Sequence, residues 1–141
     1  MEVLRIDPEH PDETALNRTA EEVLRGGIVA FPTDTIYGLG CSLFDTDAVE
    51  MLAQMKRRAR SHAFISLIPE SMQAWGLAAE VSPVAERLID RYWPGPLSLI
   101  FRAAPIVPQR VRGAGGTVAL RCPRHTLSQR LLERIGGPVV A

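Results

Sequence analysis

The stretch "GGIVAFPTDTIYGLG", residues 26–40, joins a short apolar segment to a polar one. Residues 28–32 are apolar and predict a short buried strand that begins after two glycines. The polar residues that follow it directly are Thr33, Asp34, Thr35 and Tyr37. Polar side chains at such a strand end either close a turn or hold a ligand. The residues alone leave both interpretations open.

Outward from this stretch, the apolar periodicity predicts alternating helices and strands. Helices are expected over residues 11–25, from residue 46 into the basic run "KRRARSH", and over 82–92 and 126–135. Further strands are expected over residues 63–68, 97–101, 117–121 and 138–141. The expected buried face of the second helix consists of Val49, Leu52, Ala53 and Met55. This alternation predicts a single α/β domain built on a mixed sheet.

The composition argues against a membrane protein, a secreted protein and a zinc-stabilised domain. A chain of 141 residues that is 46% hydrophobic can bury one core. No stretch approaches the length of a membrane span, and the N-terminus lacks a secretory signal pattern. Cys41 and Cys122 form no CxxC pair, which predicts a cytoplasmic protein and argues against a structural zinc site.

The charges are unevenly distributed along the chain. Residues 1–50 carry 3 Arg against 11 acidic residues, whereas residues 91–141 carry 8 Arg against Glu133 alone. Such a basic segment suits an anionic partner, either a nucleotide or RNA, unless the acidic part neutralises it in the fold. Lys56 is the only lysine among the 16 basic residues. A compact ammonium cannot be exchanged freely for a guanidinium at a tight phosphate site, which makes Lys56 a candidate.

The common nucleotide and metal motifs are missing from the sequence: it contains no P-loop, no strand-borne GxGxxG and no His/Glu pair at metal-ligand spacing. Three polar groups at element ends remain as candidates. They are the run 33–37, the basic run 56–60, and Thr117 with Arg121. Ligands of open α/β sheets bind near strand ends, so these groups could converge on one cleft. The alternative is a turn, a solvated helix end and an outward-facing arginine.

Five blocks, "GGIVAFPTDTIYGLG", "KRR", "WPGPLS", "TVALRCP" and "GGPVVA", together resemble the YrdC/TsaC family in order and spacing. The resemblance spans about residues 24–141. It implies a twisted mixed parallel/antiparallel sheet flanked by helices around a basic cavity. It also implies synthesis of threonylcarbamoyl-AMP and pyrophosphate from L-threonine, bicarbonate and ATP, with Mg2+ bound through the phosphates. A downstream transferase then passes the threonylcarbamoyl group to tRNA.

The same resemblance assigns roles to individual residues. Lys56 and Arg58 would contact the triphosphate and act in catalysis. The other ATP contacts would be His62 and Thr117. The L-threonine site would consist of Thr35, Tyr37, Arg121 and Ala141. No residue is assigned to a metal.

The chain departs from the family pattern at several positions. Ala59, Leu67 and Ser98 replace a usual proline, histidine and threonine. The Ser-x-Asn motif expected just after Ala141 is missing, so the single domain 1–141 is expected to be C-terminally incomplete and to self-associate. The segment "SHAFISLI" is similar to YciO-like relatives. Two other functions stay open: a non-catalytic RNA- or tRNA-binding module, and a carbamoyl-transfer domain like that of HypF proteins.

Overall fold

The structure is a computed structural model that describes residues 2–57 and 63–141. Arg58 and His62, two predicted ATP contacts, lie outside the described residues. The helices are α1 (Glu13–Leu24), α2 (Thr46–Met55), the 3-10 helix η1 (Ser71–Gln73), α3 (Ala74–Leu77), α4 (Pro83–Tyr92) and α5 (Thr126–Ile135). The strands are β1 (Val29–Phe31), β2 (Gly38–Ser42), β3 (Ile65–Leu67), β4 (Leu99–Arg102), β5 (Thr117–Arg121) and β6 (Val139–Val140).

Helix ends follow the local signals in the sequence. Asp45 and Ser82 accept hydrogen bonds from the first-turn amides of α2 and α4, which satisfies donors that the helix itself cannot. Helix α5 ends at Gly136, which adopts the left-handed C-cap conformation with φ +71°. Glycine tolerates this conformation because it has no Cβ. The predicted helix over 126–135 is confirmed at both ends.

The described strands form one 6-stranded sheet in the order β1-β2-β6-β3-β5-β4. Only β3 and β5 pair in parallel, and the other neighbours are antiparallel. The mixed α/β sheet predicted from the sequence is therefore confirmed. Strand β2 was not expected, and it pairs with β1 as a hairpin whose connection is the polar run 32–37.

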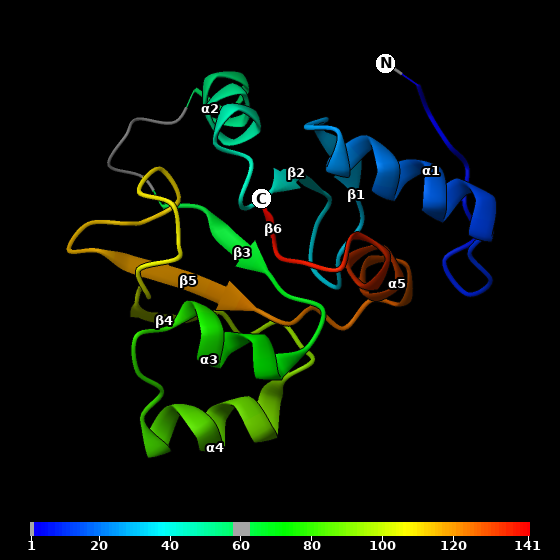
Figure 1. Ribbon diagram of the computed structural model, residues 1–141. Coiled ribbons are helices and arrows are strands. Elements are labelled where there is room, and N and C mark those ends of the chain that lie inside the picture. The colour runs from blue at the N-terminus through cyan, green and yellow to red at the C-terminus, as the bar shows by residue number, and fades with distance from the viewer. Residues whose placement is uncertain (1, 58–62) are drawn as a thin grey trace.

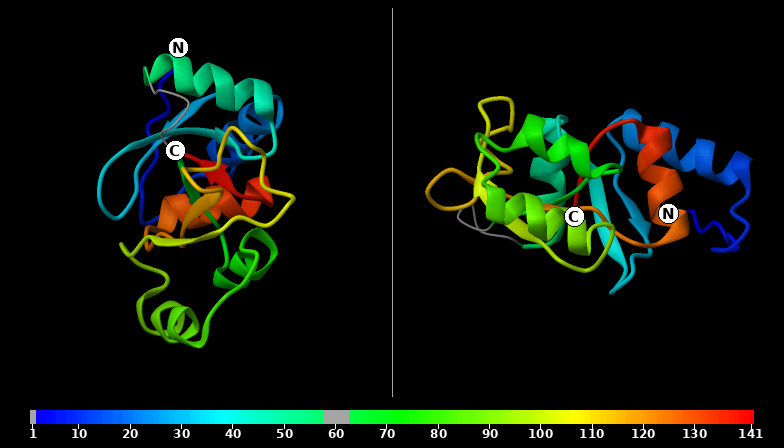
Figure 2. Two further views of the ribbon diagram at one scale, coloured as in Figure 1. Left: turned by 90° about the vertical axis from the view of Figure 1, so that its left-hand side faces the viewer. Right: turned by 90° about the horizontal axis from the view of Figure 1, so that it is seen from below.

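Two hydrophobic cores lie on the two faces of this sheet. The larger core holds the buried residues of α2, α3 and α4. The smaller core packs α1 and α5 against β1, Leu67 and Val139. Figure 1 shows α1 and α5 side by side, far from α3 and α4, and the view from below in Figure 2 agrees. The helices thus leave part of the α1–α5 face of the sheet without a cover.

Two details of the second helix and its surroundings differ from expectation. Met55 is 57% exposed and does not join the buried face, so that part of the prediction was wrong. The last residue of a helix is free to turn away once the chain leaves the core. Helix α3 was not predicted, because its four residues are too few to show a helical period.

The basic C-terminal part of the chain forms ion pairs with the acidic N-terminal part. Four of the eight arginines of residues 91–141 pair with acidic residues of the N-terminal part. The pairs are Arg110–Glu50, Arg121–Asp34, Arg130–Glu13 and Arg134–Glu13. The fold therefore neutralises much of the basic segment internally. Among the described residues, no helix combines the length and the apolar character needed to cross a membrane.

Candidate functional site

The polar run after β1 is first of all a turn. The Thr33 hydroxyl donates to the carbonyl of Ile36 at 2.6 Å and accepts from the amides of Thr35 and Ile36 at 3.2 and 3.3 Å. A threonine side chain that bonds its own turn in this way fixes the turn shape. Thr35 and Tyr37 consequently leave the turn with exposed side chains.

Arg121 lies at the end of β5, far along the chain from this turn, and its guanidinium contacts the turn. Its Nη1 donates to Thr35 Oγ1 at 3.1 Å, and its Nη2 donates to Asp34 Oδ1 in an ion pair. The Arg121 Nε donates to the carbonyl of Gly95 at 3.1 Å. The Arg121 side chain is only 8% exposed. One guanidinium therefore joins the β1–β2 turn, the end of β5 and the "WPGP" turn.

Gly95 lies where no other residue fits. A Cβ at this position would come within 2.3 Å of the Tyr92 carbonyl oxygen. The Gly95 amide also donates to the carbonyl of Cys122 at 2.8 Å. This close backbone approach brings the Gly95 carbonyl within reach of Arg121 and explains the glycine in the "WPGP" turn.

The α1–α5 face of the sheet is open next to Arg121. Successive strand residues alternate between faces, so Thr117, Ala119 and Arg121 share one face of β5. The residues paired with Ala119 on its neighbours are Ile65 and Ile100, which are 38% and 72% exposed. We call this surface the open face: the exposed Ile65 and Ile100 with the half-buried Thr117 and Ala119, bounded at one end by Arg121.

One more predicted residue borders the open face. The Ala141 amide donates to the carbonyl of Ile65 at 2.9 Å, which places Ala141 beside this strand. A Cβ at Gly38 would lie 3.6 Å from the Ala141 Cβ, so the start of β2 passes on its other side. Tyr37, just before β2, is 74% exposed. Backbone and small side chains thus form the rim of the open face near Arg121.

A pocket of about 640 Å³ adjoins the turn on the side of α5. Its lining includes Thr35, Tyr37, His125 and the N-terminal segment Val3 to Ile6. The His125 Nδ1 is buried, and among the described residues it has no hydrogen-bond partner. His125 was not predicted from the sequence, which shows only a lone histidine before a helix.

Lys56 is placed differently from Arg121. It follows the last turn of α2, whose buried face belongs to the core on the opposite side of the sheet. The chain returns at Ala63, which lies against Gly113 and therefore next to Thr117. The grouping of Lys56 with Arg121 therefore stays a prediction.

The two thiols offer no nucleophile. Burial raises the pKa of Cys41 to about 11, the charge of Asp45 adds to this effect, and Lys56 opposes it. Burial also raises the pKa of Cys122, and a hydrogen bond from Gln129 works against that increase. Burial thus favours the protonated form of both thiols, which makes neither a strong candidate for a nucleophile.

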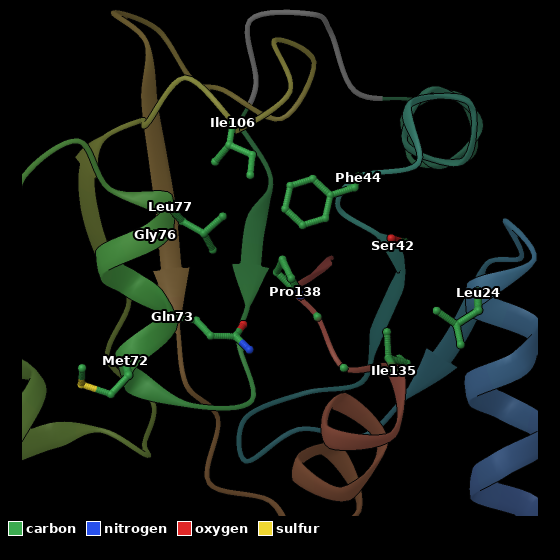
Figure 3. Close-up of a pocket in the computed structure, with 12 residues that line it drawn as sticks. Leu24, Ser42, Phe44, Met72, Gln73, Gly76, Leu77, Ile106, Ile135 and Pro138 are labelled. Atoms are coloured by element: carbon green, nitrogen blue, oxygen red, sulfur yellow. The ribbon is translucent and has the colours of Figure 1, made fainter.

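A second pocket, of about 520 Å³, lies at the other end of β2 and β6 (Figure 3). The side chains of Phe44, Ile106, Leu77 and Met72 line it, together with Pro138. Among the described residues that line it, none is a predicted site residue. Its apolar lining does not suit phosphate or carboxylate groups, so the candidate site remains the open face near Arg121.

The structure thus brings together part of the predicted set. Thr35 touches Arg121, Thr117 shares its face, and Ala141 borders the open face, whereas Tyr37 lines the pocket beside the turn. Asp34 was part of the polar run singled out in the sequence but received no role of its own, and Gly95 was not singled out. Nothing in the sequence pairs Gly95 with Arg121.

Comparison with known proteins gives a family match. The Sua5/YciO/YrdC family model, described as "Telomere recombination", matches residues 21–141. A threonylcarbamoyl-AMP synthase of Pyrococcus abyssi is 36% identical over 94% of this chain, and one of Coxiella burnetii is 33% identical over 90%. The matched regions cover 39% and 68% of those proteins. The chain therefore spans less than half of the first relative and about two thirds of the second.

Solved structures agree with this match. The crystal structure of P. abyssi Sua5 complexed with L-threonine has a TM-score of 0.94 at 34% identity, over 99% of this chain and 41% of that one. Escherichia coli YciO has a TM-score of 0.88 at 29% identity, over 96% of this chain and 66% of that one. A full-length HypF structure, at 21% identity and a TM-score of 0.76, shows likeness of fold alone.

Proposed function

This chain belongs to the Sua5/YciO/YrdC family, and we propose that its open face binds L-threonine and ATP and forms threonylcarbamoyl-AMP. The observation that carries the proposal is the setting of Arg121 beside Thr35 at one end of the open face. The similar P. abyssi Sua5 was crystallised as a complex with L-threonine, which supports the same substrate here.

Arg121 would bind the carboxylate of L-threonine. A guanidinium has five N–H bonds, and the contacts to Gly95, Thr35 and Asp34 use three of them. Within the described residues, Nη1 and Nη2 of Arg121 each keep one N–H bond that has no hydrogen-bond acceptor. Each of these N–H bonds can donate to a carboxylate oxygen, and a bond between two charged groups is stronger than a neutral one. The Thr35 hydroxyl, Tyr37 and the backbone at Ala141 would border the rest of the amino acid.

ATP would lie along the other half of the open face. Thr117 is four residues from Arg121 on the same face of β5, a separation of roughly 13 Å along a strand. That length accommodates a nucleotide whose α-phosphate points toward the amino acid. Lys56, Arg58 and His62 remain proposed ATP contacts on the family resemblance.

The proposed chemistry needs positioning more than a protein nucleophile. The amine of L-threonine would add to CO2 with release of a proton, or to bicarbonate with release of water, and the resulting carbamate oxygen would attack the α-phosphate while pyrophosphate leaves. The site would hold both reactants in line and neutralise charge on the phosphates. In this proposal the carbamate acts as the nucleophile, and the raised pKa of both thiols is consistent with that role.

Mg2+ would enter with ATP. This ion prefers oxygen ligands and commonly binds through substrate phosphates. The described residues contain no group of three His, Cys, Asp or Glu side chains that could hold a metal ion. Phosphate oxygens would therefore supply most of its ligands. We place the reaction in the cytoplasm, where the free thiols Cys41 and Cys122 would stay reduced, and assign the product to a downstream transferase acting on tRNA.

Mass spectrometry tests the proposal. The chain is incubated with ATP, Mg2+, L-threonine and bicarbonate, and threonylcarbamoyl-AMP is quantified with omission of each component as control. Product that requires all components supports the function. Tight tRNA binding without product under any condition would instead support the RNA-binding alternative, which the internal pairing of four arginines makes less favourable.

A further inference from the structure

Asp34 has an unusual setting for a residue in an exposed turn. Its side chain is 14% exposed, and its Oδ1 accepts from Arg121 Nη2. Its Oδ2 is buried and, among the described residues, has no hydrogen-bond partner. The neighbours Thr33 and Thr35 use their hydroxyls inside the turn and toward Arg121. Asp34 is therefore an enclosed carboxylate directed at one guanidinium.

We propose that Asp34 is a positioning residue that fixes the orientation of Arg121 and thereby sets the affinity for the carboxylate of the amino-acid substrate. The inference rests on the proposed function, because it concerns the same site. Asp34 itself would not touch the substrate, since both its oxygens are directed into the protein. Its influence would pass through the guanidinium.

The orientation of Arg121 depends on three anchors from two turns. The Gly95 carbonyl holds Nε, the Thr35 hydroxyl holds Nη1 and Asp34 holds Nη2. Only the last anchor is charged, and hydrogen bonds between ions are roughly twice as strong as neutral ones. With all three in place the guanidinium plane is fixed, and its two unused N–H bonds keep one direction relative to the open face.

Removal of the Asp34 charge has two opposing effects. It takes away the partner that neutralises Arg121, which by Coulomb attraction alone would strengthen binding of a substrate carboxylate. It also leaves a guanidinium that is 8% exposed without an anion. A buried unpaired charge is unfavourable, so Arg121 would turn toward solvent and lose its fixed direction. We expect the loss of orientation to dominate, since the neutral anchors cannot offset the desolvation of a cation.

The test compares Asp34→Asn with a matched substitution elsewhere. Asp90→Asn makes the same chemical change at an exposed position of α4, outside the site. Calorimetry measures the affinity for L-threonine and, separately, for ATP. Asp34→Asn should weaken L-threonine binding about tenfold, the lower range expected for a hydrogen bond to a charged group. ATP affinity should change less than about twofold in both variants.

A conservative variant and a spectroscopic measurement make the test independent of one substitution. Asp34→Glu keeps the charge at a longer reach, so its affinity for L-threonine should lie between those of the parent and Asp34→Asn. In the parent, NMR should resolve the Nη protons of Arg121 separately, because three anchors slow rotation of the group. In Asp34→Asn the guanidinium should rotate faster, so the separate Nη signals should merge into one averaged signal.

The outcomes separate the two proposals. A parent chain that does not bind L-threonine refutes the proposed function, and the NMR comparison then decides whether Asp34 fixes Arg121. If the parent binds but Asp34→Asn binds equally well or more tightly, the inference is wrong and the proposed function stands. Equal losses of L-threonine and ATP affinity would reduce Asp34 to a structural role and overturn the inference. If Asp34→Asn does not fold, averaged Nη signals in the parent would overturn it too.

Discussion

Gly95→Ala should destabilise the protein through one backbone contact. The added Cβ would lie 2.3 Å from the Tyr92 carbonyl oxygen, and real Cβ atoms keep at least about 3 Å from such atoms. The turn must therefore move by close to an ångström, and no flexible side chain can absorb the shift. Overpacking of this kind costs about 1–3 kcal/mol. The same movement displaces the Gly95 carbonyl from Arg121, now 3.1 Å away, so L-threonine affinity should fall as well.

Urea unfolding measures this effect, with Gly76→Ala as the matched control. A Cβ at Gly76 meets nothing within 4 Å, and alanine favours a helix over glycine by roughly 0.5–1 kcal/mol. Gly76→Ala should therefore be as stable as the parent or more stable. If Gly95→Ala unfolds at the parental urea concentration and binds L-threonine normally, the close approach at Tyr92 does not matter and this explanation of the "WPGP" turn is refuted.

Two other perturbations test the site and the core. Lys56→Arg keeps the charge but replaces a compact ammonium with a broader group, so threonine-dependent pyrophosphate release should fall about 100-fold, as small misplacements can cause; near-parental turnover would remove Lys56 from the mechanism. Burial raises the pKa of Cys41 to about 11, so this thiol ionises at lower pH in the unfolded chain than in the folded one. The free energy of unfolding should therefore fall by about 2 kcal/mol between pH 9 and 11. Cys41→Ala should remove this part of the pH dependence, and an identical slope in urea unfolding of both proteins would contradict the assignment.

Local signals predicted most elements of the fold. The caps at Asp45 and Ser82, the glycine after α5 and the apolar periodicity all act within a few residues, so the sequence displays them directly. Strand β2 was missed because "GLGCS" has the glycine content of a loop. A Cβ at Gly40 would lie 2.5 Å from the Val140 carbonyl oxygen, so contact with β6 explains the glycine. That contact joins residues 100 positions apart and leaves no local trace.

The site was predictable only in part for the same reason. Thr35 and Arg121 could be singled out as polar residues at strand ends, and the structure joins them by a hydrogen bond. The ion pair of Arg121 with Asp34 and the anchor at Gly95 depend on how the turns meet in space. Likewise, the basic C-terminal segment suggested an anionic partner, but the fold pairs much of it with the acidic N-terminal part.

A crystal structure of this chain with L-threonine tests the proposed site most directly. We expect the substrate carboxylate to lie on the open face, within hydrogen-bond distance of both terminal nitrogens of Arg121, with the Thr35 hydroxyl beside the amino acid. The amine should point along β5 toward Thr117, where ATP would follow. L-threonine bound away from Arg121, or with its carboxylate directed elsewhere, would contradict the proposed role of this arginine.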